Sequence, residues 1–304
     1  MHKKASVIIT SYNQKKYLIE AVESVINQTV KAHEIIIADD HSTDGSVEVI
    51  NKYIARYPEW IKGIFQKENV GIPKNRNSAL QKVTGDYVSI LDGDDLLLPQ
   101  WIERMMDVLG ADPMTRCVYS NIRIINQEGE FIEIRDKMLQ QSGDIFHEIA
   151  LGNFGILRSM IIDYNLLKSI GFFDEKIPKY DGFDLTVRLA KICRYSYIDE
   201  PIAEYRVHPL SDSKTLKAKD HLHDLGIIYN KMLPLLKDLP KIQKKEIEKV
   251  WYQMLLRIYS NDTVEAGNKI KLYFLPLMAL FHGYVNLNNF YDASKFYYKN
   301  IKQY

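Results

Sequence analysis

The chain has 304 residues, of which 46% are hydrophobic and 26% charged, and its formal net charge at pH 7 is +1. These values are ordinary for a soluble globular protein of about two domains, and they exclude an intrinsically disordered chain. The two cysteines, Cys117 and Cys193, lack the paired spacing of a disulfide framework or a zinc site. We therefore expect a protein of the reducing cytoplasm.

No apolar run has the length of a membrane span, and the nearest approach, residues 272–285, is interrupted by Pro276, His282 and Gly283. The first residues do not form a signal peptide. Residues 210–304 carry 15 Lys and Arg against 9 Asp and Glu, so this part is basic and the preceding part acidic. Such a tail either rests on anionic lipid or presents solvated lysines on helix faces. Peripheral membrane association is thus one expectation, and nucleic acid is not an expected partner.

Along the first hundred residues, strand-like and helix-like patterns alternate. The predicted order is strand 6–10, a helix after Asn13, strand 34–38, a helix after the polar loop 39–46, strand 61–66, helix 75–82 and strand 87–91. Alternation with short connections predicts an α/β fold with a mostly parallel, doubly wound sheet and helices on both faces.

Polar clusters follow three of these strands, at the point where each strand ends. They are Thr10 to Asn13, Asp39-Asp40 and Asp92 to Asp95. Ligands of such sheets bind at the carboxyl ends of the strands, where the loops form a crevice. The three clusters are therefore expected to meet at one site.

The last of these clusters places three acids within four positions: Asp92, Asp94 and Asp95, with Gly93 between the first two. Carboxylates this close repel one another and favour a balancing cation. Oxygen ligands suit Mg²⁺ or Mn²⁺, which would hold a diphosphate, and Gly93 would let a bulky ligand approach the backbone. The alternative is a solvated acidic turn that caps a helix beginning near Leu96.

The blocks 6–13, 34–46, Asn69-Val70-Gly71 with Arg76-Asn77, and 91–95 together resemble the successive signatures of glycosyltransferase family 2. The resemblance covers about the first 210 residues. It implies a GT-A fold, a nucleotide-sugar donor, a divalent metal, Mn²⁺ or Mg²⁺, and inversion at the anomeric carbon. We assign residues 1–214 to the catalytic domain and 215–304 to a C-terminal helical region.

The resemblance also implies roles on the donor side. Thr10 and Tyr12 would line the nucleoside pocket, with the ring of Tyr12 stacking on the base, and Asp40 would accept a hydrogen bond from the base, which suggests a UDP-sugar. Arg76 would contact the diphosphate. Asp92 would contact ribose or the metal, Gly93 would lie beside the donor, Asp94 would bind the metal, and Asp95 would serve the acceptor side or cap a helix.

The segment from Glu204 to Ser211 resembles the end of the same catalytic domain. His208 is a candidate to complete the metal coordination begun by Asp94. Arg206 and Ser211 would close over the diphosphate as part of a mobile loop.

The expected base region departs from the family. The family has a Glu-Asp pair just before a helix of the form Asp-Leu-x-x-Arg-Leu, and the second acid is the base. In this chain the helix begins at Asp184-Leu185, so Asp181 falls on the Glu and Gly182 on the base. Asp181 or Asp184 would then act as the catalytic base, with Asp181 favoured, or catalysis has been lost.

Beyond Lys214, residues 223–236 and 246–259 show helical periodicity, and residues 289–299 faintly resemble one helix of a tetratricopeptide unit. A homodimer is a further expectation. Two main functional readings stay open: an inverting, metal-dependent glycosyltransferase that extends a bacterial surface glycan on a glycan or lipid-linked acceptor, and a catalytically silent nucleotide-sugar-binding subunit. A nucleotidyltransferase is disfavoured because Ser11 to Gln14 is not a glycine-rich phosphate loop.

Overall fold

The computed structural model describes residues 3–135, 139–152, 156–209 and 218–265. The chain divides into two units, the first comprising residues 1–146 and 153–211 and the second residues 147–152 and 212–304. The proposed domain boundary at residue 214 falls outside the described residues.

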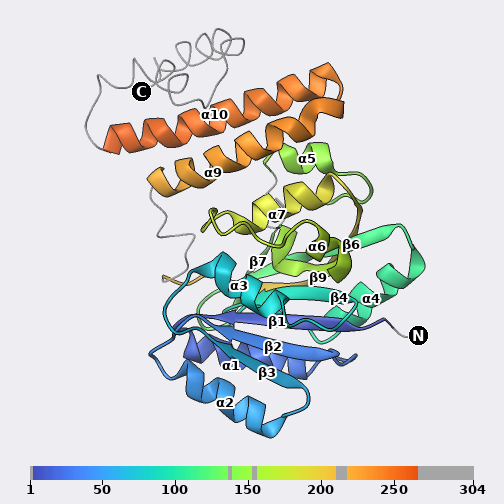
Figure 1. Cartoon of the computed structure of the whole chain (residues 1–304), viewed down its shortest axis with the longest axis vertical. Helices are drawn as coiled ribbons and strands as arrows, with labels where there is room; N and C mark the ends of the chain where they lie inside the picture. Colours follow the sequence, from blue (N-terminus) through green and yellow to red (C-terminus); the bar gives the residue numbers. More distant parts are fainter. Residues whose placement is uncertain (1–2, 136–138, 153–155, 210–217, 266–304) are drawn as a thin grey trace. The chain divides into compact units, whose positions relative to one another are not determined.

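The described residues of unit 1 form a nine-stranded sheet (Figure 1). The strands are β1 (Ala5–Ser11), β2 (Glu34–Asp39), β3 (Ile61–Phe65), β4 (Tyr87–Asp92), β5 (Leu96–Leu97), β6 (Thr115–Ile125), β7 (Phe131–Ile134), β8 (Met160–Asp163) and β9 (Arg194–Arg206). Every residue of β1 and β2 is buried, as expected for strands covered on both faces.

The strand order is β3-β2-β1-β4-β8-β6-β9-β5, and β7 pairs with β6. The first four strands are parallel, as predicted. Beyond β4 the sheet is mixed: β8 is antiparallel to both β4 and β6, whereas β6 and β9 are parallel. Since β8 reverses direction between them, β6 and β9 run the same way as β1 and β4. The α/β prediction is confirmed, and the antiparallel pairs lie in the half of the chain where no motif indicated strand direction.

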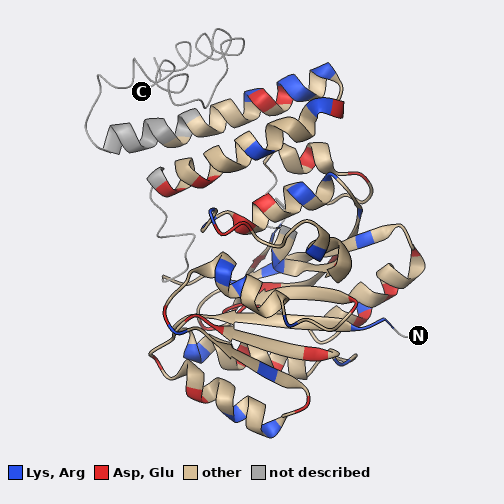
Figure 2. Ribbon diagram, viewed as in Figure 1, with Lys and Arg blue, Asp and Glu red and all other residues tan. Residues whose placement is uncertain are grey.

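The helices of unit 1 pack on this sheet. They are α1 (Lys15–Ile26), α2 (Ser46–Arg56), α3 (Ile72–Leu80), α4 (Trp101–Ala111), α6 (Tyr164–Ser169), α7 (Asp181–Ala190) and the short 3₁₀ helix η1 (Ile156–Ser159). Figure 1 shows α2 below strands β1 to β3 and α3 above them. Figure 2 shows the charged residues mainly on helices and loops, whereas the strands are largely uncharged.

Sequence and structure differ just after the acid cluster. A helix beginning near Leu96 was one alternative, but Leu96 and Leu97 form β5, which pairs antiparallel with Ala203 and Glu204 of β9. The helix α4 begins only at Trp101, whose side chain is fully buried. The acid cluster therefore lies in a turn between two strands, and it does not cap a helix.

Unit 2 is helical in its described residues, with α5 (Phe146–Ala150), α9 (Ala218–Met232), η2 (Leu233–Asp238) and α10 (Lys241–Glu265). The Trp251 ring is fully buried, packs against Tyr229 at 5.5 Å between ring centroids, and donates a hydrogen bond from Nε1 to the Ala150 carbonyl. Within the described segments, no helix combines the length and apolar character that a membrane span requires. The tetratricopeptide-like stretch 289–299 lies outside the described residues.

Candidate active site

Strand register explains why the predicted clusters meet. In the parallel sheet, Thr10 is paired with Asp92 of β4, and Ser11 is paired with Asp39 of β2. The three strands end together, so the residues that follow them share one edge of the sheet. Thr10 Oγ1 donates a hydrogen bond to Asp92 Oδ1 over 3.2 Å.

Arg76 is the centre of the site. It comes from the buried face of α3, and its guanidinium donates from Nη2 to Asp92 Oδ1 (2.5 Å) and from Nη1 to Asp181 Oδ2 (2.6 Å). Its Nε is buried and has no hydrogen-bond partner in the described part of the chain. One cation thus joins an acid of β4 to an acid of α7, 89 residues further along the chain.

Arg76 binds two acids, Asp92 and Asp181, whose pKa values shift in opposite directions. Burial raises the pKa of Asp92, but the positive charges of Arg76 and Arg158 outweigh this effect and lower it below its ordinary value. For Asp181, burial is dominant, so its pKa is raised even though Arg76 opposes the shift. A buried carboxylate with a raised pKa is a better proton acceptor than an ordinary aspartate, as general base catalysis requires.

Asp184, the alternative base, faces a different partner. Its Oδ2 accepts hydrogen bonds from Arg188, one turn later in α7, at 2.8 Å. Arg188 also donates to the carbonyl oxygens of Ile170 and Phe172. Asp184 therefore takes part in fastening α7 to the preceding loop, whereas Asp181 reaches Arg76. This geometry favours Asp181 as the base.

Gly182 stands where the family has its base, and the structure shows what fills the space. A Cβ atom at Gly182 would lie 2.8 Å from Cδ2 of Leu157. Real Cβ atoms do not approach other atoms so closely, so an acid at position 182 would require Leu157 to move. In this chain, Leu157 of η1 therefore occupies the space that the side chain of an acid at position 182 would need.

Asp94 and His208 form a second pair. His208 Nε2 lies 2.9 Å from Asp94 Oδ2, and the buried imidazole ring packs against Tyr17, with 4.9 Å between ring centroids. Burial raises the pKa of Asp94, and the charge of Asp92 adds to this shift, while His208 opposes it. Among the described residues, no three His, Cys, Asp or Glu side chains are already grouped as metal ligands. Asp94 and His208 are adjacent, whereas the contacts of Asp92 Oδ1 are to Arg76 and Thr10.

Arg206 has a different role from the one expected. The prediction placed it on a loop that closes over a diphosphate, but its side chain is fully buried at the end of β9. Nε donates to the Asp94 carbonyl (3.0 Å), Nη2 donates to Glu20 (2.5 Å), and the main-chain N–H donates to Asp95 Oδ1 (3.0 Å). Arg206 therefore holds the acid turn in place through the Asp94 carbonyl and the Asp95 carboxylate. Ser211 lies outside the described residues.

On the nucleoside side, Tyr12 is exposed over 48% of its surface, so its ring is available for stacking. Asp40 is buried, and its two oxygens accept hydrogen bonds from the main-chain N–H groups of Val70 (2.7 Å) and Gly71 (2.9 Å). Each oxygen retains a second lone pair for a base. Asp39 accepts hydrogen bonds from Ser42 instead and shapes the turn.

Position 93 requires glycine for a structural reason that sequence reasoning did not identify. A Cβ at this position would lie 2.7 Å from the Thr10 carbonyl oxygen, and the Gly93 N–H donates to that same oxygen. The close approach that requires glycine is therefore to β1 of the same chain. A contact of Gly93 with the donor stays a prediction.

Sequence reasoning missed Arg158 of η1. Its guanidinium lies over the Tyr205 ring, 3.8 Å from the ring centroid, and Nη1 is 3.6 Å from Asp95 Oδ2. Burial raises the pKa of Asp95 well above its ordinary value, and the charge of Asp94 adds to this shift. No local pattern distinguishes Arg158 from a surface arginine, because its partners come from the acid turn and from β9.

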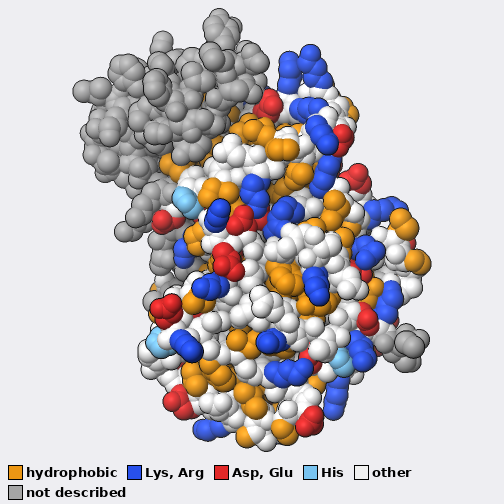
Figure 3. All heavy atoms as spheres, viewed as in Figure 1, with side chains coloured by type: hydrophobic (Ala, Val, Ile, Leu, Met, Phe, Trp, Pro, Cys, Tyr) orange, Lys and Arg blue, Asp and Glu red, His pale blue; other side chains and the backbone are white. Residues whose placement is uncertain are grey.

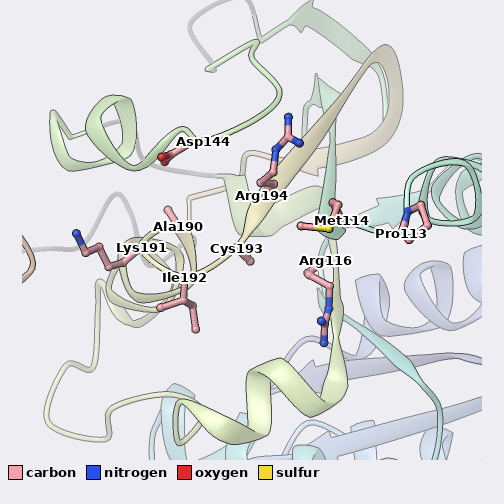
Figure 4. A pocket seen from close by; sticks show the side chains of 9 residues that line it. All are labelled: Pro113, Met114, Arg116, Asp144, Ala190, Lys191, Ile192, Cys193 and Arg194. Atoms are coloured by element: carbon pink, nitrogen blue, oxygen red, sulfur yellow. The ribbon is translucent and has the colours of Figure 1, made fainter. Parts of the chain in front are cut away.

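A cavity of about 400 Å³ lies apart from these acids (Figure 4). Its lining includes Met114 and Arg116 near the start of β6, and Cys193 and Arg194 near the start of β9. Since β6 and β9 run the same way as β1 and β4, this cavity is at the opposite edge of the sheet from the acid cluster. None of the predicted site residues lines it.

Comparison with known proteins decides the family. A model of glycosyl transferase family 2 matches residues 6–168, which is more than half of the chain. The chain belongs to glycosyltransferase family 2. This confirms the resemblance carried by the four sequence blocks. The match includes Thr10, Arg76, Asp92 and Asp94, and ends before Asp181.

Among curated relatives, a chondroitin synthase from Escherichia coli is 38% identical over 201 residues, which are 64% of this chain and 28% of that protein. The chain spans less than half the length of the first curated relatives it matches.

Solved structures establish the fold. TarS from S. aureus in complex with UDP matches with a TM-score of 0.65 and 21% identity, covering 90% of this chain and 78% of that one. The mannosyltransferase PcManGT from Pyrobaculum calidifontis, in complex with GDP-Man and Mn²⁺, matches with a TM-score of 0.61 and 17% identity, covering 97% and 86%. The family 2 chain has the GT-A fold.

Proposed function

We propose that this protein is an inverting, metal-dependent glycosyltransferase that moves a sugar from a nucleotide-sugar donor, with UDP as its nucleotide, to a hydroxyl of a glycan or lipid-linked acceptor. The observation that carries the proposal is the bridge from Asp92 through Arg76 to Asp181. It brings a cation suited to phosphate and a carboxylate suited to proton removal into one buried network.

The donor side rests on the ends of β1, β2 and β4. The exposed Tyr12 ring and the second lone pairs of Asp40 are available to a nucleobase. UDP and GDP-Man occur in the titles of structural neighbours, which supports a nucleotide-sugar in general. The choice of UDP rests on Asp40 and on the family resemblance.

Asp94 and His208 fit a divalent cation. A carboxylate oxygen and an imidazole nitrogen lie within hydrogen-bond distance of one another, and both are acceptable ligands of Mn²⁺. Asp92 would add a further oxygen from the same turn. When bound, such a cation neutralises negative charge on the diphosphate.

The chemical step is displacement at the anomeric carbon. Asp181 takes the proton of the acceptor hydroxyl, the acceptor oxygen forms the new bond to the anomeric carbon, and the bond to the diphosphate oxygen breaks. Arg76 stabilises the charge that develops on the departing diphosphate. Attack from the face opposite the leaving group gives inversion.

A test is the release of UDP from a panel of UDP-sugars with Mn²⁺, which needs no knowledge of the acceptor. We expect one sugar to turn over, with UDP release abolished by Asp94→Ala and strongly reduced by Asp181→Asn. Asp107→Ala, an exposed acid on α4, is the matched control and is expected to match wild type. Binding of UDP without turnover, also with candidate acceptors, would favour a catalytically silent nucleotide-sugar-binding subunit. Failure to bind UDP would refute the nucleotide assignment.

The pathway, the location and the assembly of the protein are also part of the proposal. Bacterial surface-polysaccharide synthesis, a cytoplasmic location, peripheral membrane association and a homodimer are predictions. On the face shown in Figure 3, both signs of charge are interspersed over the described residues of unit 1.

A further inference from the structure

Two cysteines that are 76 positions apart in the chain meet in the folded structure. Cys117 lies in β6, and Cys193 directly precedes β9. The register of these parallel strands is irregular between Thr115 and Cys117, and Cys117 is paired with Tyr195, two positions after Cys193. The two Sγ atoms lie 3.6 Å apart, and both cysteines are free thiols. The proposed sugar transfer uses neither of them.

The contact between the two sulfur atoms is close to the geometry of a disulfide. Bond formation requires them to approach by about 1.5 Å more, to a separation of about 2 Å. Cys117 is fixed, because it is fully buried in β6 between β8 and β9. Cys193 lies in the short connection between α7, which ends at Ala190, and β9, which begins at Arg194. We therefore expect the Cys193 side chain to move toward Cys117.

The two thiols differ in their access to solvent. Cys193 is partly exposed and lines the cavity of about 400 Å³ shown in Figure 4, whereas the buried Cys117 is not part of this lining. Three cationic side chains and one acid also line the cavity: Arg116, Lys191, Arg194 and Asp144. Reactive cysteines in proteins typically have such partly exposed, electropositive surroundings. A small oxidant in the cavity therefore reaches Cys193 first.

Cys117 is unsuited to be the first cysteine oxidised. Burial raises the pKa of its thiol well above the ordinary value, and the hydrogen bond with Cys193 adds to this shift. The thiolate is the form of cysteine that attacks an oxidant, so Cys117 reacts poorly with oxidants by itself. Its position against Cys193 instead suits attack on a sulfur atom that has already been oxidised.

We propose that Cys193 is a site of reversible oxidation by hydrogen peroxide and that Cys117 is its resolving partner. The Cys193 thiolate attacks one peroxide oxygen, the O–O bond breaks, hydroxide leaves, and a sulfenic acid remains on Cys193. Cys117 Sγ then attacks the sulfenic sulfur, so that the S–S bond forms and the S–O bond breaks. The sulfenic oxygen leaves as water with the thiol proton of Cys117. The two thiols are oxidised to a disulfide, and the peroxide is reduced to water.

The disulfide would fasten the connection after α7 to the central strand β6. The Cys193 N–H already donates to the Leu189 carbonyl in the last turn of α7, over 3.0 Å. A disulfide that closes a long loop stabilises a protein mainly by constraining its unfolded chain. We therefore expect the oxidised protein to unfold at a higher urea concentration than the reduced one. In a reducing compartment the pair would be thiols at rest and would form the bond under oxidative stress.

Peroxide treatment of the reduced full chain tests the site. Remaining thiols are alkylated, and mass spectrometry of the peptides identifies the products. We expect a pair of peptides joined through Cys117 and Cys193, separated again by dithiothreitol. The bond should form about 10-fold faster in the folded chain than in urea, where a long loop keeps the two thiols apart. The urea midpoint of the folded chain should rise on oxidation and return on reduction.

Single variants separate the two roles. In Cys117→Ala, oxidation should stop at the sulfenic acid of Cys193, which dimedone traps. In Cys193→Ser, Cys117 should stay reduced while the chain is folded, and it should become reactive in urea. Equal oxidation of Cys117 in the folded Cys193→Ser variant would contradict the order of attack.

The wild-type chain decides the proposal even if a variant fails to fold. Two thiols that both stay reduced after peroxide treatment, disulfides formed only between chains, or equal rates in folded and unfolded chains would overturn it. A sulfenic acid that persists on Cys193 of the wild-type chain would overturn the role of Cys117. None of these measurements involves sugar transfer, so failure of the proposed function would leave the result unchanged.

Discussion

Nη1 of Arg76 lies 2.6 Å from Oδ2 of Asp181, and both side chains are buried. The position and the charge of Asp181, the favoured base, therefore depend on an arginine of α3 that lies 105 positions earlier in the chain. The same arginine also holds Asp92. This relationship allows the roles of the neighbouring acids to be separated experimentally.

Replacement of the two candidate bases should give different defects. We expect Asp181→Asn to lower kcat by about 100-fold to 10,000-fold, the usual contribution of a positioned base, with little change in donor KM. Asp184→Asn should instead lower the free energy of unfolding by about 1–3 kcal/mol, because the half-buried Arg188 loses its charged hydrogen-bond partner. Steady-state kinetics and urea unfolding of both variants check this. A large kcat loss confined to Asp184→Asn would reverse the assignment.

Removal of the Arg76 charge should shift the pH dependence of activity. A base acts in its deprotonated form, so activity rises with pH through the pKa of Asp181, which burial raises above its ordinary value of 3.8. Arg76 opposes this rise, and its loss should raise the pKa further. In Arg76→Gln, the acidic limb of the kcat/KM profile should therefore move to higher pH, whereas Arg123→Gln should leave it in place. An unmoved limb would show that Asp181 is not the titrating base.

Substitution of Gly182 should strain the packing against Leu157. The new Cβ in Gly182→Ala would approach Leu157 Cδ2 to 2.8 Å, and because this terminal methyl group can turn away, we expect a loss of about 1 kcal/mol in unfolding free energy, the low end of overpacking. Leu157→Val should recover part of this loss in the double variant, which a double-mutant cycle by urea unfolding would measure. Gly110→Ala is the control, because a Cβ at Gly110 in α4 meets no atom within 4 Å. Additive effects of the two changes would argue against the contact.

A buried acid far from the site should make stability depend on pH. Burial raises the pKa of Glu34, but hydrogen bonds from Lys62, Thr84 and Ser6 outweigh it and bring the pKa to about 2. Because the folded-state pKa lies below the unfolded one, this stabilisation is complete above about pH 4.5 and is lost as the pH falls toward 2. Glu34→Gln should thus be less stable than wild type at pH 7, by at most about 3 kcal/mol. The difference should narrow between pH 4.5 and 3 in urea unfolding, and a constant difference would contradict the linkage.

The first half of the fold was predictable because its signals are local. Strands such as Ser6–Thr10 and Tyr87–Leu91 are short apolar runs that end in polar clusters, and their parallel order brings Thr10 beside Asp92. Strand direction beyond β4 was not predictable, because it depends on pairings such as Leu96 with Glu204. Such pairings leave no trace in local periodicity.

The same limit explains the misassigned and missed arginines. Arg206 bonds Glu20, 186 positions away, and Arg158 stacks on Tyr205, so neither contact is visible from neighbouring residues. Arg76 was found because it lies within a family signature. The roles of Arg158 and Arg206 can be inferred only from their contacts in the folded structure.

Because Arg206 holds the acid turn, its contacts bear on whether the site could form in a shortened chain. The turn that carries Asp94 lies within the stretch 6–168 recognised by the family model, but the arginine that holds its carbonyl and the histidine beside its carboxylate come later in the chain. A protein shortened to that stretch would retain Tyr12 and Asp40 for a nucleoside, yet it would lack Asp181, Arg206 and His208. On the proposed function, the residues for the nucleotide lie in the first part of the chain, whereas the reactive centre also requires residues from α7, the end of β9 and His208 beyond it.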